Sequence, residues 1–219
     1  MEKAKELFLQ NKSAFDRYYE LLVFWNERFN LTAITEKDEV EVKHFIDSLS
    51  SVDLISENAS LLDIGSGAGF PSLPLKIVRP DITLTMVDSV NKKVGFLNEV
   101  VKRLNLEGAE AIHSRAEDLD KDKKYDFVVS RAVASLSTLL EYCLPFVKEG
   151  GYLIAYKSEK TDEEILESKN TLTILGGAID KVVDKSHNGL NRKLIVVKKI
   201  APTPKKYPRG KNLPRVKPL

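Results

Sequence analysis

Three glycines and two acidic residues form the part of this chain whose residue types and spacing are best suited to chemistry. Residues 61–70 read Leu-Leu-Asp-Ile-Gly-Ser-Gly-Ala-Gly-Phe, so an apolar run ends in Asp63 and then breaks into a glycine-rich loop. Glycine has no Cβ, and such a loop lets the backbone approach a bound molecule closely. A second apolar run ends in Asp88, whose carboxylate is suited to accept hydrogen bonds from ribose hydroxyls. Together the two segments predict a nucleoside-binding site.

The spacing of the glycines indicates which nucleoside this site would hold. A nicotinamide dehydrogenase usually carries Gly-x-Gly-x-x-Gly, whereas this chain has Gly65, Gly67 and Gly69, and Phe70 stands where the third glycine would be. Asp63 precedes the first glycine by two positions, where a carboxylate would repel a pyrophosphate and attract a cationic amino group. The pattern favours the methyl donor S-adenosylmethionine over a dinucleotide. A tight turn without a ligand would not need three glycines.

Two more segments are expected at the same edge of the sheet. The predicted strand 109–113 is followed by Ala116 and Glu117, which could contact an adenine through a backbone group and a carboxylate. Glu117 could equally stabilise the N-terminus of a helix, and the two roles are compatible. The predicted strand 125–130 is followed by Arg131, at the carboxyl edge where ligands bind in such sheets. Arg131 could hold the donor's carboxylate, shape the acceptor pocket, or form a surface ion pair.

The elements that must position these residues alternate between strand and helix. We expect helices at 71–79, 91–104, 135–148 and 161–175, and strands at 60–64, 82–87, 109–113, 125–130, 151–156, 178–184 and 193–199. Such alternation predicts a parallel sheet with right-handed crossovers, and the last two strands are expected to form a hairpin. The predicted fold is therefore α/β: a Rossmann-like, seven-stranded, mostly parallel sheet with helices on both faces, as in class I S-adenosylmethionine-dependent methyltransferases.

The first 55 residues are expected to form a helical extension that packs on this sheet. Aromatic and aliphatic residues recur at helical spacing along 13–29, a pattern more typical of core than of a binding surface. A second helix, capped by Thr35, is expected to run to about Leu49. The predicted organisation is an N-terminal extension at 1–55, a methyltransferase domain at 56–200, and a basic, flexible tail at 201–219.

Composition and charge limit the remaining possibilities. The chain has 219 residues, one cysteine and three histidines. A single cysteine rules out an internal disulfide framework, and so few cysteines and histidines argue against a metal site. No targeting segment or membrane span is evident, so a cytoplasmic, monomeric protein is expected. The segment 198–219 holds eight basic residues and no acidic residue, so the net charge of +2 divides into +8 there and −6 on residues 1–197. A basic segment on an acidic body favours a polyanionic partner, although a solvated tail without a partner has the same composition.

The type of acceptor follows from what surrounds the fourth strand. Ser130-Arg131-Ala132-Val133 lacks the Asn/Asp-Pro-Pro-aromatic motif of enzymes that methylate exocyclic adenine nitrogens. Cys143 falls inside a predicted amphipathic helix, which favours a core thiol over a cytosine-C5 nucleophile. An acceptor with a free lone pair, such as guanine N7, needs no general base, and positioning then carries catalysis.

As a whole, the chain resembles the bacterial 16S ribosomal RNA guanine-N7 methyltransferases, formerly called the glucose-inhibited division protein B family. The resemblance rests on these segments: Trp25-Asn26 with Asn30-Leu31-Thr32, His44-Phe45-Ile46-Asp47-Ser48, Asp63-Ile-Gly-Ser-Gly-Ala-Gly-Phe-Pro-Ser, Val87-Asp88-Ser89 with Lys92-Lys93 and Phe96-Leu97, Arg115-Ala116-Glu117, Ser130-Arg131-Ala132-Val133-Ala134, and Thr203-Pro-Lys-Lys-Tyr-Pro-Arg209. It implies methylation of one guanine in the loop near the decoding site of 16S ribosomal RNA.

The resemblance also implies roles for individual residues. Donor contacts fall on Gly65, Phe70, Ala116, Glu117 and Arg131, to which the fold argument adds Asp63, Gly67 and Asp88. His44, Asp47 and Ser48 are assigned to the acceptor pocket together with Arg131, with a helix-packing network as the alternative. No residue is assigned to acid–base catalysis, and no metal is expected. The tail lysines and arginines would contact RNA phosphates, and the target guanine would leave its stack.

Two other functions remain open at this point. The donor site could serve a small-molecule or protein acceptor, in which case removal of residues 201–219 would leave activity unchanged. The chain could instead be a non-catalytic nucleotide-binding regulator of cell division, which would bind the donor without transfer. Whether the substrate is free RNA, an assembly intermediate or the mature subunit is also left open.

Overall fold

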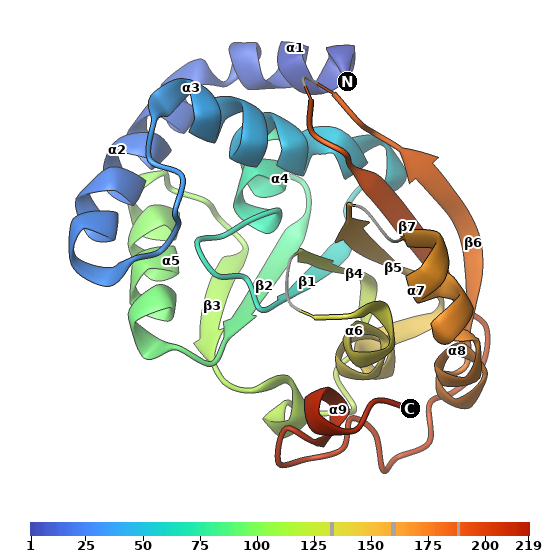
Figure 1. Cartoon of the computed structure of the whole chain (residues 1–219). Coiled ribbons are helices and arrows are strands. Elements are labelled where there is room, and N and C mark those ends of the chain that lie inside the picture. The colour runs from blue at the N-terminus through green and yellow to red at the C-terminus, as the bar shows by residue number, and fades with distance from the viewer. Residues whose placement is uncertain (132–133, 159–160, 188) are drawn as a thin grey trace.

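A seven-stranded sheet runs through the centre of the protein, in the order β3-β2-β1-β4-β5-β7-β6 (Figure 1). The computed structural model describes residues 1–131, 134–158, 161–187 and 189–219, so Ala132 and Val133 of the predicted 130–134 motif lie outside the described residues. The strands are β1 (Ser60–Ile64), β2 (Thr83–Asp88), β3 (Ala109–His113), β4 (Tyr125–Arg131), β5 (Val147–Lys157), β6 (Gly177–Asp184) and β7 (Lys193–Lys199).

The direction of the strands confirms the predicted fold class. Strands β1 to β5 are parallel to one another, and β7 pairs antiparallel with both β5 and β6. The chain order reverses between β1 and β4, and in such sheets ligands bind outside the carboxyl ends of the strands at this point. Asp88 ends β2 and Arg131 ends β4, so the topology brings these two residues to that edge.

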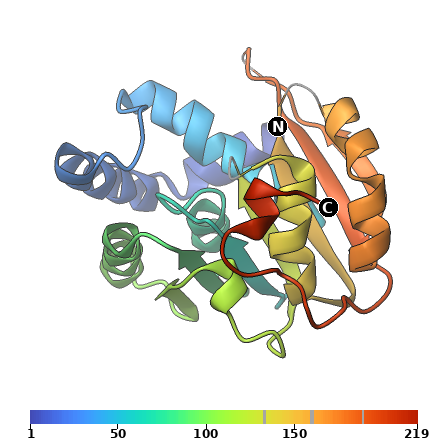
Figure 2. The same ribbon diagram turned by 60° about the horizontal axis from the view of Figure 1, so that its bottom comes forward.

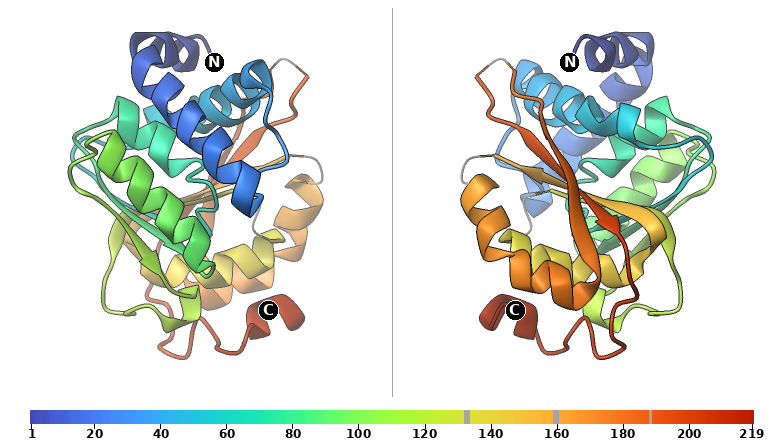
Figure 3. Two further views of the ribbon diagram at one scale, coloured as in Figure 1. Left: turned by 90° about the vertical axis from the view of Figure 1, so that its left-hand side faces the viewer. Right: turned by 90° about the vertical axis from the view of Figure 1, so that its right-hand side faces the viewer.

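Helices cover both faces of the sheet (Figures 1 and 3). Side chains alternate along each strand, so Leu61 joins the core on one face and Leu62 the core on the other. The first core is shared with α1 (Glu2–Gln10), α2 (Lys12–Phe29), α4 (Ser72–Val78) and α5 (Asn91–Arg103). The second core is covered by α6 (Leu136–Cys143) and α8 (Lys169–Leu175), with α7 (Thr161–Glu167) beside them. No helix in the described ranges is both long and apolar enough to span a membrane.

The N-terminal extension packs into the first core as expected. The aromatic stripe on α2 faces this core: Phe15 and Tyr18 are fully buried, and the partly exposed Trp25 lies against Phe96 of α5. The next helical segment consists of α3 (Lys37–Val40), a π-helical turn η1 (Glu41–Ile46) and a 3-10 helix η2 (Leu49–Leu54). The prediction that Thr35 caps this segment is wrong, because the helix begins at Lys37 without a side-chain cap.

The helix predicted at 135–148 is shorter in the structure. It ends at Cys143 and is followed by a 3-10 turn, η4 (Leu144–Phe146), after which β5 already begins at Val147. Pro145 explains the change, because proline has no backbone N–H to continue an α-helix. The predicted helix 161–175 is divided at Ser168 into α7 and α8.

The basic C-terminal segment packs against α6 (Figure 2), which differs from the flexible tail that the sequence predicts. Tyr207 is buried, and Thr138 of α6 donates a hydrogen bond to the carbonyl of Pro214 in the short helix α9 (Leu213–Val216). Arg209 forms an ion pair with Glu141, whose side chain is 1% exposed. Composition alone could not show this, because the partners of these residues lie in distant parts of the chain. The division of the chain at residues 55 and 200 stays a prediction.

Candidate functional site

A cavity of about 520 Å³ opens at the carboxyl ends of β1, β2 and β4. This volume is within the range of pockets that hold small ligands and cofactors. The walls come from the ends of the central strands, the N-terminal extension and the C-terminal segment. The lining residues are Leu31, Thr32, His44, Ile64, Gly65, Ser66, Gly67, Ala68, Phe70, Val87, Asp88, Ser89, Val90, Lys93, Ser114, Arg115, Ala116, Glu117, Arg131, Tyr142, Asn212 and Arg215.

The glycine loop contributes two of its three glycines to the cavity wall. Gly65 and Gly67 line the cavity, and both have positive φ angles that favour glycine. Gly69 serves packing instead, because a Cβ there would lie 2.4 Å from Leu73 Cδ1 and 2.6 Å from the Tyr18 hydroxyl oxygen. Tyr18 also donates a hydrogen bond to the carbonyl of Ala68, so the N-terminal extension supports the loop from behind.

Asp88 is fixed at the tip of β2 by backbone amides. Its Oδ2 accepts a hydrogen bond from Gly67 N at 2.9 Å, and its Oδ1 accepts one from Val90 N at 2.9 Å. Each carboxylate oxygen therefore retains a lone pair for another donor. Lys93 lies 3.9 Å away and adds a positive charge beside the carboxylate. This arrangement places a rigid hydrogen-bond acceptor on the cavity wall.

Asp63 lies behind the glycine loop and is not on the cavity wall. Its side chain is fully buried, and Ser72 Oγ donates a hydrogen bond to Oδ2 at 2.5 Å. Oδ1 is buried and has no hydrogen-bond partner among the described residues. Burial raises the pKa of the Asp63 carboxyl to about 7. A cationic group in the cavity would stabilise the carboxylate form across the loop.

The wall that follows β3 combines the predicted residues with the C-terminal segment. Ala116 and Glu117 both line the cavity, as do Asn212 and Arg215. Asn212 N donates a hydrogen bond to Glu117 Oε1 at 3.2 Å, and the Tyr142 hydroxyl donates one to Asn212 Oδ1 at 3.1 Å. The C-terminal segment therefore holds the Glu117 carboxylate in place as part of the cavity. No pattern in the sequence points to Asn212, since its partners are far away in the chain.

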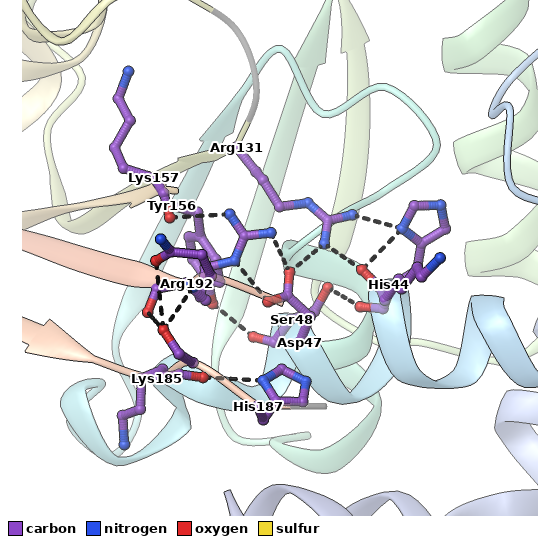
Figure 4. Close-up of polar contacts among 12 residues, drawn as sticks. His44, Asp47, Ser48, Arg131, Tyr156, Lys157, Lys185, His187 and Arg192 are labelled. Atoms are coloured by element: carbon purple, nitrogen blue, oxygen red, sulfur yellow. Dashed lines mark hydrogen bonds and ion pairs between the residues drawn. The ribbon is translucent and has the colours of Figure 1, made fainter. Parts of the chain in front are cut away.

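Arg131 is held by an ion-pair cluster behind the opposite wall (Figure 4). Its Nη1 donates to Asp47 Oδ2 at 2.8 Å, and Arg192 donates to both Asp47 oxygens at 2.6 and 2.9 Å. Asp47 is 0% exposed and lies between the two guanidinium groups. Ser48 is buried beside it and donates to the carbonyl of His44 at 2.5 Å. Asp47 and Ser48 therefore support the wall without lining the cavity, in contrast to their predicted place in an acceptor pocket.

His44 lies on the cavity wall between aromatic and polar partners. Its ring stacks on Phe70, with ring centres 4.5 Å apart, and its Nε2 lies 2.9 Å from Thr32 Oγ1. Burial lowers the pKa of His44 to about 4, assisted by the charge of Arg131, so the ring is neutral near pH 7. The π-helical turn η1 places His44 here while Asp47, one turn later, faces the core.

Eight of the eleven predicted site residues line the cavity, and the structure brings them together from separate strands and from η1. These eight are His44, Gly65, Gly67, Phe70, Asp88, Ala116, Glu117 and Arg131. The prediction did not identify Thr32, Tyr142, Asn212 and Arg215 on the wall, or Arg192 behind it. Thr32 belongs to a segment that the resemblance already singled out, which is the one available indication for it.

Cys143 is buried in the second core, and burial raises its pKa well above the ordinary value of a thiol. A core role is thus confirmed for this cysteine. Among the described residues, no group of histidine, cysteine, aspartate or glutamate side chains is arranged to hold a metal ion.

Comparison with known proteins agrees with this geometry. Residues 11–195 match the model of the family described as GidB, rRNA small subunit methyltransferase G. A ribosomal RNA small subunit methyltransferase G from Desulforamulus reducens is 49% identical, over 94% of this chain and 89% of that protein. One from Lactobacillus johnsonii is 46% identical, over 98% and 94%. A solved S-adenosylmethionine-dependent methyltransferase from Aquifex aeolicus is 20% identical and shares the fold, with a TM-score of 0.57 over 75% of this chain and 94% of that one.

Proposed function

Since this chain belongs to the rRNA small subunit methyltransferase G family, we propose that it transfers a methyl group from S-adenosylmethionine to N7 of one guanine in 16S ribosomal RNA. The observation that carries the proposal is the cavity at the sheet edge, which has an acidic strand tip at Asp88 and a glycine loop at its base. A ribosomal RNA substrate implies that the protein acts in the cytoplasm. We propose that it acts as a monomer on the RNA or the small subunit.

The residues present fit this donor. The buried carboxylate of Asp63 would attract the donor's cationic amino group across the glycine loop, and the open space beside Gly67 is suited to close approach of a ligand. Asp88 would accept the ribose hydroxyls through its two free lone pairs. Ala116 and Glu117 would contact the adenine at the wall that the C-terminal segment completes.

When bound, S-adenosylmethionine supplies a sulfonium methyl group: the N7 lone pair forms the new N–C bond, the S–C bond breaks, and its electron pair stays on sulfur. The acceptor nitrogen carries no proton, so no side chain has to remove one. The protein's contribution is to align the base with the donor and to exclude water. His44 is neutral near pH 7, which suits a reaction whose base product is cationic.

The acceptor base would enter beside His44, Phe70 and Arg131. Phe70 contacts both of the others: the Arg131 guanidinium lies 5.0 Å from the centre of its ring, and His44 stacks on the same ring. A guanine in a paired stem cannot reach this wall, because the major groove of an RNA helix is deep and narrow. The base would therefore have to leave its stack before transfer.

Only part of the basic C-terminal charge is free to contact RNA. Arg209 is paired with Glu141, and Lys199 is buried and bonds the carbonyl of Leu175. Lys205, Lys206, Lys211 and Lys217 are exposed. Exposed lysines suit sequence-independent contacts to phosphates. The C-terminal segment would therefore both complete the donor cavity and position the RNA.

The proposal is tested by incubating the protein with labelled S-adenosylmethionine and small subunits, or their free RNA, from cells that lack this enzyme. We expect one methyl group per RNA, at N7 of a single guanine, when the product is mapped. Methylation of another base or atom would contradict the acceptor assignment and leave the fold unaffected. Donor binding without transfer to any RNA would favour the regulatory alternative instead.

Two substitutions in the glycine loop should have different main effects, since the backbone strain of an added Cβ at a positive φ angle is common to both. An added Cβ at Gly67 meets only Gly65 O, at 3.9 Å, and would occupy the donor's space, so Gly67→Ala should weaken donor binding at least tenfold. Gly69→Ala should lower stability instead, by roughly 2 kcal/mol, because its Cβ would overlap Leu73 and Tyr18. Calorimetric titration with the donor and urea unfolding measure the two effects. Equal loss of stability in both variants would contradict this division of roles.

The C-terminal segment should be required for donor binding. Arg209→Ala leaves the buried Glu141 carboxylate without its cation, so the segment should detach from α6 and release Asn212 from Glu117. We expect donor affinity to fall roughly tenfold. Lys217→Ala removes the same charge from an exposed position and serves as the control. Unchanged donor affinity in the Arg209 variant would show that the Arg209–Glu141 ion pair is not needed for donor binding.

A further inference from the structure

Three side chains on the cavity wall form a hydrogen-bonded row that begins at Arg131 and ends at Thr32. Arg131 Nη2 lies 3.3 Å from His44 Nδ1 (Figure 4), and His44 Nε2 lies 2.9 Å from Thr32 Oγ1. All three residues line the cavity. The direction in which each group donates decides what the last member of the row offers to a ligand.

The arginine fixes the protonation of the histidine ring. A guanidinium group can only donate hydrogen bonds, so the contact with Arg131 requires a lone pair on His44 Nδ1, whereas the Lys43 carbonyl would accept a proton from the same nitrogen. The carbonyl of Lys43, 3.1 Å from the same nitrogen, also accepts from Arg131 Nη1 at 3.3 Å and does not need the histidine proton. We therefore assign the one proton of the neutral ring to Nε2, from which it is donated to Thr32.

The hydroxyl of Thr32 is then left with one function. Its oxygen accepts from His44 Nε2 and from the backbone amide of Ile34 at 3.1 Å, which occupies both lone pairs. With the proton on His44 Nε2, the Thr32 O–H has no acceptor among the described residues, and Thr32 lines the cavity. Asn26 Oδ1 accepts from the backbone amide of Thr32 at 2.9 Å and holds this position in the loop. Thr32 thus presents a fixed donor that cannot accept.

We propose that the Thr32 hydroxyl donates a hydrogen bond to the O6 carbonyl of the acceptor base and thereby selects guanine over adenine. The inference rests on the proposed function, which brings a guanine N7 to this cavity. O6 is the acceptor next to N7 on the same edge of guanine, whereas adenine has an amino group in that place. An amino group would face a donor whose lone pairs are occupied, and a buried polar group without a partner is costly.

The test changes the residue at position 32 and the target base, separately and together, and compares the rates of methyl transfer. Small subunits are reconstituted with RNA that carries either guanine or 2-aminopurine at the mapped target, because 2-aminopurine keeps N7 and lacks O6. The wild-type protein should prefer guanine by about tenfold in kcat/KM, the effect of one neutral hydrogen bond. Thr32→Val should lose this preference, and Thr32→Ser should keep it, because serine retains the hydroxyl.

The ratio of kcat/KM between the guanine and 2-aminopurine substrates separates recognition of O6 from structural damage caused by the substitution. Thr32→Val also removes the acceptor for His44 and Ile34, but this loss lowers the rate with both bases alike. A guanine preference that persists in Thr32→Val would overturn the proposal, and so would its loss in Thr32→Ser. If the wild-type product is not N7-methylguanine, the proposed function fails as well. If the product is N7-methylguanine and the preference persists, only the role of Thr32 fails.

Discussion

The Arg131→Ala variant should lose about two orders of magnitude in kcat/KM for methyl transfer while it remains folded. Arg131 ends β4 on the cavity wall, with its guanidinium 5.0 Å from the ring centre of Phe70 and 3.3 Å from His44 Nδ1. Its removal would free the His44 ring and widen the place where the acceptor base is aligned. Misalignment by about 1 Å is sufficient for a loss of this size.

The fold should survive this change because the charge behind the wall stays balanced. Asp47 keeps two hydrogen bonds from Arg192, at 2.6 and 2.9 Å, when Arg131 is absent. The buried carboxylate therefore still has a cation, and the free energy of unfolding should fall by only about 1 kcal/mol. Arg131→Lys keeps the charge but not the planar guanidinium group. Its free energy of unfolding should therefore be closer to the wild-type value than its rate of methyl transfer is.

Single-turnover transfer to small subunits, together with urea unfolding, measures both quantities. Wild-type turnover in Arg131→Ala would show that the arginine is peripheral to the reaction. A collapse of stability equal to that of an Asp47 variant would show that Arg131 serves the fold alone.

Asp47→Asn should produce the largest loss of stability among these variants, roughly 3 kcal/mol. The substitution removes the negative charge and leaves Arg131 and Arg192 beside each other, with side chains only 10% and 15% exposed. Two like charges taken out of water repel each other and have no compensating anion. The thermal midpoint should fall by roughly 6–12 °C for a chain of this size.

Thermal unfolding followed by circular dichroism measures the effect, with Asp53→Asn as the matched control. Asp53 pairs with Lys3 at the surface, where both side chains are about half exposed, and such pairs contribute roughly 0.5 kcal/mol. A midpoint in Asp47→Asn within the range of the control would show that the buried cluster does not stabilise the protein.

The contrast between Asp47 and His44 illustrates the limit of what can be predicted from the sequence. Both belong to a segment that the resemblance links to the acceptor pocket, and three positions separate them on one helical turn. The structure places His44 on the wall and Asp47 behind it, because Asp47 pairs with arginines at positions 131 and 192. A local pattern cannot show which side of a buried helix meets which strand tip.

The sequence by itself determined the α/β fold, the succession of strands and helices along the chain, and the donor-binding edge. These features depend on spacing within short segments: alternating apolar residues form strands, glycines at 65 and 67 open a loop, and acidic residues end strands. Tertiary structure alone decided that Gly69 packs against Tyr18, that Asn212 completes the cavity and that Thr32 meets His44 on the cavity wall. Each of these depends on contacts between distant elements, and their geometry exists only after the chain has folded.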